Sequence, residues 1–149
     1  MNKIQKQLKR DLKESMKKGK DSRVPTIRDM LDGLRAKSKE TEGDLSEEKA
    51  QKVLKRKAKQ RRDSIESFEE GEREDLAEKE KKELEIIEEY LPEQLDNNEL
   101  ENIIEKIIEE VGAVDMSDMG SVMGRAMEEV GVRAEGGRVK EMVKSKLSS

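Results

Sequence analysis

The sequence contains no histidine and no cysteine in its 149 residues. Without them the chain cannot form disulfides, perform thiol redox chemistry or build Ser-His-Asp and Cys-His triads, and it lacks the usual zinc ligands. A site made of oxygen ligands for Mg²⁺ or Ca²⁺ stays open, but no EF-hand spacing is present. We therefore expect no metal ion, no cofactor and no catalytic residues.

Aromatic residues and long apolar runs are also scarce. Phe68 and Tyr90 are the two aromatic residues, which argues against a sheet protein. No apolar run approaches the roughly 20 residues of a membrane span, and the basic N-terminal segment lacks the apolar stretch of a secretory signal. About half of the chain is Ala, Glu, Lys, Leu or Arg, a composition typical of long helices. We predict a soluble, cytoplasmic, all-α monomer that does not bind membranes.

Apolar residues recur at helical spacing and predict seven helices with short loops. Ser46 is a suitable N-cap for the third helix, and Gly71 ends that helix and folds it against the fourth as an antiparallel hairpin. Pro92 ends the fourth helix, and Asp96 with Glu99 resembles a capping box that opens the fifth. We predict an N-terminal bundle of four helices over residues 1–92 and a small C-terminal domain of three helices over residues 93–149.

Charge is distributed unevenly along the chain. The net charge is −4 overall, but residues 1–65 carry +10 and residues 66–110 carry −14. On the third helix the basic residues Lys55, Lys59 and Arg62 share one face and are candidates for contacts with nucleic-acid phosphates. The alternative is a salt-bridge scaffold, because the hairpin brings Arg61 close to Glu80 and Glu83.

A glycine-rich turn precedes the last helix. Gly136 and Gly137 leave backbone N–H groups open at the helix start, where anions bind favourably. The sequence does not match a Walker or dinucleotide-binding motif. A plain turn and a contact with RNA phosphates are both open interpretations here; the candidate basic residues around the turn are Arg133, Arg138, Lys140 and Lys144.

Two further clusters have structural interpretations. Six glutamates of the fourth helix, within residues 78–89, are expected to form a solvated face or to pair with the third helix. Met116, Met119, Met123 and Met127 lie along one helical stripe and are expected to pack in the core. Gly120 and Gly124, four residues apart, are expected to permit close approach of another backbone.

Two motifs resemble those of the YqeY-like (GatB/YqeY) family. The first extends from Lys59 to Leu95, and its marked positions are Arg61, Ser64, Arg73, Leu76, Glu80, Glu83, Tyr90, Leu91 and Pro92. The second, at residues 119–124, contributes Gly120, Met123 and Gly124. A third family motif, Gly-Arg-Ala-Asp-Gly-Lys, is altered to Val132-Arg133-Ala134-Glu135-Gly136-Gly137, which loses the lysine.

That family is similar to the C-terminal tail of the B subunit of the glutamine-dependent aspartyl/glutamyl-tRNA amidotransferase. The resemblance implies a helical, non-catalytic adaptor that binds tRNA, with a tRNA synthetase or an amidotransferase component as a further partner. The family label also carries carbon–nitrogen ligase activity with glutamine as amido donor, which we interpret as inherited from the larger enzyme. A protein-interaction module that does not bind RNA is the second alternative.

Overall fold

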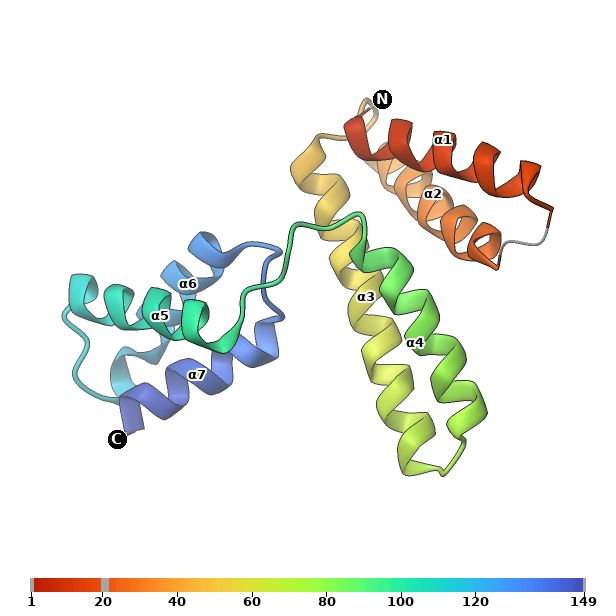
Figure 1. The fold of residues 1–149 in the computed structure, drawn as a ribbon. Coiled ribbons are helices and arrows are strands. Elements are labelled where there is room, and N and C mark those ends of the chain that lie inside the picture. Colours follow the sequence, from red (N-terminus) through yellow and green to blue (C-terminus); the bar gives the residue numbers. More distant parts are fainter. Residues whose placement is uncertain (1, 20–21, 149) are drawn as a thin grey trace. The chain divides into compact units, whose positions relative to one another are not determined.

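A computed structural model describes residues 2–19 and 22–148 of the chain. Within these ranges it contains seven α-helices and one short 3₁₀ turn, and no strand (Figure 1), which confirms the predicted all-α class. The chain divides into two compact units, Met1–Pro92 and Glu93–Ser149. No helix in the described ranges is long and apolar enough to cross a membrane.

The first unit begins with helices α1 (Lys3–Lys17) and α2 (Arg23–Glu40), which pack together. The side chain of Asn2 caps α1 by accepting a hydrogen bond from the Gln5 N–H at 2.9 Å. Apolar side chains at spacings of three and four residues turn one face of each helix into the core. The buried set from these two helices is Ile4, Leu8, Ile27, Met30, Leu31 and Leu34.

Helices α3 (Glu47–Glu70) and α4 (Glu74–Glu88) form the predicted antiparallel hairpin. Ser46 caps α3 as expected, with its hydroxyl accepting from the Lys49 N–H at 3.2 Å. The hairpin turn differs in one detail: Gly71 has a negative φ, and Glu72 takes the left-handed conformation at φ 59°. The Arg73 N–H then bonds the Phe68 carbonyl at 2.7 Å, so a Schellman-type turn ends α3.

The second unit contains α5 (Asn97–Val111), the 3₁₀ turn η1 (Met116–Asp118), α6 (Met119–Val130) and α7 (Gly136–Ser148). The predicted capping box is present: Asp96 accepts from the Glu99 N–H at 2.8 Å, and Glu99 accepts from the Asp96 N–H at 3.2 Å. Apolar faces of the three α-helices meet in one core. Its buried helical residues are Leu100, Ile104, Ile107, Val122, Ala126, Val130, Val139, Val143 and Leu147.

Candidate nucleic-acid interface

The three cations predicted on α3 lie in different surroundings. Lys59 is exposed and its Nζ pairs with Asp63 Oδ2 at 3.1 Å, four residues along the helix. Lys55 is half-buried and also has an interaction partner. Arg62 is half-buried and has no ion-pair partner within the described part of the chain. Of these three predicted cations, Arg62 is therefore the one whose charge has no partner among the described residues.

Arg61, next to that trio, is the centre of an ion cluster that joins α2, α3 and α4. Its Nε lies 2.8 Å from Glu83 Oε2 and 3.4 Å from Glu80 Oε2, and its Nη2 donates to Asp29 Oδ2 at 3.1 Å. Lys57 donates to the other oxygen of Asp29 at 3.2 Å. The Arg61 side chain is 19% exposed, so water screens these charges weakly. The scaffold interpretation holds for this position.

The contacts between Arg61 and the two glutamates are ionic rather than directional. Nε of Arg61 and Oε2 of Glu80 are both shielded from solvent, and neither makes a hydrogen bond of good geometry within the described residues. Desolvation of such charges is costly, and the attraction between them offsets it only while every partner is present. Removing Arg61 would leave Glu80 and Glu83 on α4 without their cation at a partly buried site, while Asp29 on α2 would keep Lys57.

Tyr90 fixes the end of the first unit. Its hydroxyl donates to Asp11 on α1, and burial together with this bond raises the pKa of the phenol well above its usual range. Next to it Glu89 pairs with Arg23 at the start of α2, and this bond raises the pKa of the guanidinium. Leu91 packs against the core just before Pro92. Tyr90 and Leu91, two positions of the first family motif, therefore stabilise the fold of the first unit.

The remaining positions of the first motif lie along the hairpin. Arg73 is exposed and its Nε pairs with Asp75 at 3.4 Å, which lowers the pKa of that carboxyl. Ser64 on α3 and Leu76 on α4 are half-buried. None of these positions gathers into a cluster that could perform acid–base chemistry.

The second motif corrects one expectation. Gly120 and Gly124 are exposed on α6, and a Cβ built on either would meet no atom within 4 Å in the described structure. The prediction that they permit close backbone approach is therefore wrong within this chain, because the apolar side of α6 carries the packing. Met119, Met123 and Met127 pack against the core of the second unit, as predicted. The same prediction is wrong for Met116, which lies in the turn η1 and is exposed.

The turn before α7 holds Arg133 in a structural role. Its guanidinium donates to the carbonyls of Glu129 at 3.0 Å and Val130 at 3.4 Å, which satisfies acceptors at the end of α6. Ala134 is fully buried, and the Leu95 N–H bonds the Arg133 carbonyl at 2.8 Å. This turn therefore holds the start of the second unit in place, and two nitrogens of the Arg133 guanidinium donate hydrogen bonds within it.

Helix α7 begins with the two predicted glycines. Gly136 lies next to α6, because a Cβ built on it would be 3.7 Å from Met127 Cε. Gly137 is exposed. Arg138 donates to the Asn97 side-chain oxygen at 3.0 Å, which ties α7 to the start of α5. Arg138 directly follows the two glycines in the chain, and part of its hydrogen-bonding capacity is used within the second unit.

Lys140 and Lys144 are the least committed of the predicted cations. Both are exposed and stand one turn apart on α7, and neither has a carboxylate within 4.0 Å in the described residues. Lys146 on the same helix pairs with Glu101 and Glu105 of α5 at 2.6 and 2.8 Å. The hydrogen bond and charge of Lys146 lower the pKa of Glu101, and the glutamates raise the pKa of Lys146.

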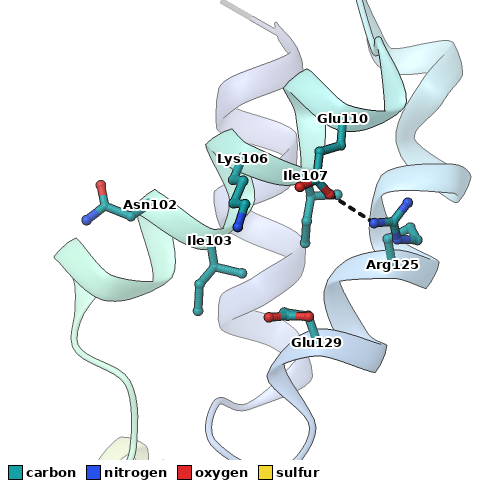
Figure 2. A pocket seen from close by; sticks show the side chains of 7 residues that line it. All are labelled: Asn102, Ile103, Lys106, Ile107, Glu110, Arg125 and Glu129. Atoms are coloured by element: carbon teal, nitrogen blue, oxygen red, sulfur yellow. Dashed lines mark hydrogen bonds and ion pairs between the residues drawn. The ribbon is translucent and has the colours of Figure 1, made fainter.

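A groove of about 250 Å³ lies between α5 and α6 and was not foreseen from the sequence (Figure 2). Ile103 and Ile107 line it on one side. Arg125 Nη2 pairs with Glu110 Oε2 across it at 3.0 Å. The remaining lining residues are Asn102, Lys106 and Glu129. No spacing in the sequence marks this groove, because it depends on how α5 and α6 pack against each other.

Three known proteins are similar to this chain, and each is named altered inheritance of mitochondria protein 41, mitochondrial. The protein from Lachancea thermotolerans is 42% identical over 85 residues, or 56% of this chain and 46% of the relative. The protein from Vanderwaltozyma polyspora is 35% identical over 124 residues, covering 76% and 65%. The protein from Clavispora lusitaniae is 32% identical over 145 residues, covering 95% and 84%. The chain thus spans less than two thirds of the first two relatives.

These names contradict the cytoplasmic location predicted from the sequence. All three relatives are named mitochondrial. The prediction depended on the lack of an apolar signal stretch, but mitochondrial targeting segments are amphipathic and basic and contain no such stretch. Its absence therefore does not distinguish the two compartments.

The family assignment is supported by nearly the whole chain and not by the two motifs alone. A model of the Yqey-like protein family matches residues 5–147, which include both motifs and the altered turn before α7. The resemblance found in the sequence is thereby confirmed. The chain belongs to the Yqey-like protein family.

Proposed function

We propose that this chain is a non-catalytic adaptor that binds tRNA. The observation that carries the proposal is the pair Lys140 and Lys144, exposed on one face of α7 with no carboxylate partner among residues 2–19 and 22–148. They follow the glycine start of the helix, where free N–H groups and the helix dipole favour a phosphate. Each lysine that neutralises a phosphate also releases a counterion, which favours binding.

The scarcity of aromatic residues agrees with recognition of a folded RNA. Proteins that bind single strands stack the bases on aromatic side chains, and this chain has one tyrosine and one phenylalanine. Double-helical RNA is instead recognised by its shape, its phosphates and its 2′-hydroxyls. The acceptor and anticodon stems of tRNA are surfaces of this kind.

A filter-binding titration with a tRNA pool tests the proposal. The pool should contain cytosolic and mitochondrial tRNA, because the relatives carry mitochondrial names. The wild-type chain should bind at low salt, and the logarithm of affinity should fall linearly with the logarithm of salt concentration. Charge reversal at Lys140 and Lys144 should weaken binding more than reversal at Lys79 and Lys82, two exposed lysines of α4. No binding by the wild-type chain at low salt refutes the proposal.

Ligase activity has a direct test. The purified chain, mixed with ATP, glutamine and misacylated tRNA, should form no amide product, because the sequence has no histidine or cysteine and matches no Walker motif. A tRNA synthetase or an amidotransferase component would then supply the chemistry. Turnover by the purified chain alone would overturn the adaptor role.

A protein-interaction module is the second candidate, and the groove between α5 and α6 favours it. Ile103, which is half-buried, offers an apolar surface, whereas Ile107 is buried in the core. Lys106, Arg125, Glu110 and Glu129 offer charges of both signs around this surface (Figure 2). Such an apolar centre with a charged rim is typical of protein interfaces. Loss of a captured protein partner on Ile103→Asp substitution, with tRNA affinity unchanged or absent, would favour this candidate.

A further inference from the structure

Helix α1 presents a straight row of positive charge. Its basic residues at successive spacings of three and four are Lys3, Lys6, Arg10, Lys13 and Lys17. Because an α-helix turns by about 100° per residue, these five positions fall within an arc of about 80° and extend over about 21 Å. We call these five residues the α1 stripe.

Packing of the opposite face fixes the direction of the α1 stripe. Ile4 and Leu8 are buried in the core of the first unit, and the polar residues Gln5 and Ser15 are buried beside them. All five members of the stripe are exposed. Rotation of the helix would bring charges into the core, so the stripe faces solvent.

The carboxylates of α1 are engaged elsewhere. Asp11 accepts from the Tyr90 hydroxyl and from Gln7 Nε2 at 2.9 Å. Glu14 pairs with Lys18 at 3.8 Å. None of the five stripe cations has a carboxylate within 4.0 Å in the described residues.

The carboxylates on the facing helix α2 are occupied as well. Asp29 is held by Lys57 and Arg61, and Asp32 pairs with Arg35 at 3.8 Å. The ion pairs of the first unit therefore leave the stripe without internal neutralisation. Five like charges in a row repel one another, and an external polyanion removes that repulsion.

We propose that the α1 stripe binds the phosphate backbone of a double-helical RNA stem. This proposal depends on the proposed function and adds a second contact surface, on the first unit, to the one on α7. A regular line of phosphates matches a regular line of cations, and an α-helix about 10–12 Å wide lies along the backbone rather than within the narrow major groove of A-form RNA.

An anionic membrane fits the stripe less well. Helices that lie in a bilayer interface insert an apolar face among the lipid chains. Ile4 and Leu8 of the apolar face of α1 are buried in the core of the first unit, and Met16 is the one large apolar side chain of the helix that is exposed in the described residues. Adsorption would be mainly electrostatic, so a duplex phosphate backbone is the better partner.

The test compares two variants with equal net charge. The stripe variant is K3Q/K6Q/K13Q/K17Q, and the control variant is K39Q/K49Q/K79Q/K82Q, which removes four exposed lysines from α2, α3 and α4. Gln and Lys have similar helix propensities, so both variants should melt near the wild-type temperature. Binding to a tRNA pool and to a simple RNA stem-loop is measured by filter retention from about 50 to 200 mM salt.

The stripe variant should bind RNA at least tenfold more weakly than the control, with a salt slope shallower by about 3–4, from roughly 0.9 per lost phosphate contact. Equal affinity in the two variants would refute the stripe, while binding by the wild type would keep the proposed function. No RNA binding by the wild type would overturn both proposals. Binding to phosphatidylserine–phosphatidylcholine vesicles without RNA binding would assign the stripe to a membrane instead.

Discussion

The two compact units stabilise their helices in different ways. The first unit contains all three buried polar side chains among the described residues, Gln5, Ser15 and Thr26, and the partly buried Arg61 ion cluster. The second unit has an apolar core, and its ion pairs are on the surface. Polar contacts specify helix positions through geometry, whereas apolar packing tolerates exchange of similar volumes. The first unit should therefore be more sensitive to loss of charge and the second to loss of volume.

The two units also differ in net charge. Residues 1–92 carry a net charge of +2 and residues 93–149 a net charge of −6. Within the first unit the acidic residues of α4 neutralise part of α3, and α1 keeps an uncompensated row of cations. A polyanion should therefore meet less repulsion at the first unit than at the second.

Loss of core volume in the second unit should have the largest effect. Ile104 is fully buried on α5, and Ile104→Ala should destabilise this unit by about 2–5 kcal/mol. If the predicted domains fold separately, circular dichroism should then show an early transition, and proteolysis should cut near residues 91–98. Ile103→Ala, at the half-buried edge of the same helix, is the control and should cost less. A single transition or cutting within residues 50–70 would refute the boundary.

Loss of the central cation in the first unit should have the next largest effect. Arg61→Gln should cost about 2–4 kcal/mol, because it leaves partly buried carboxylates without their partner. Arg62→Gln is the matched control, and it should change stability by less than about 0.5 kcal/mol. Chemical denaturation measures both variants. Equal midpoints would mean that the cluster contributes no more than exposed ion pairs do.

The cap at the end of α6 should have a smaller effect. Arg133→Gln should destabilise the second unit by about 1 kcal/mol, because two carbonyls lose donors. Arg138→Gln, which removes one exposed bond to Asn97, should cost less. Thermal melting distinguishes the two variants. A larger loss in the Arg138 variant would contradict the cap assigned to Arg133.

The pH dependence of the surface pair on the second unit should be the smallest effect. Pairing with Lys146 lowers the pKa of Glu101 below its ordinary value of 4.5. The stabilisation is therefore present above that value and is lost as the pH falls through the lowered pKa. The difference in melting temperature between the wild type and Lys146→Gln should shrink between pH 6 and pH 3, and Lys144→Gln should show no such trend. A constant difference across this range would mean that the pair contributes nothing.

Local patterns in the sequence predicted the features that depend on neighbouring residues. The capping box at Asp96 and Glu99, the Ser46 cap and the apolar stripes follow from spacings of three and four residues, and each was found. The pairing of Arg61 with Glu80 and Glu83 also followed, because a short turn fixes the register of an antiparallel hairpin. These contacts are decided within one helix or one hairpin.

Long-range contacts decided which charges stay available. Asp29 of α2 pairs with Arg61 of α3, and the Tyr90 hydroxyl donates a hydrogen bond to Asp11 of α1. The Arg133 guanidinium donates to a carbonyl at the end of α6. None of these contacts follows from spacing, because each depends on how separate helices pack. The sequence thus determined the helices and the number of cations, whereas the tertiary structure determined which cations are paired inside the fold. A charge is available to a partner only where packing places no opposite charge beside it.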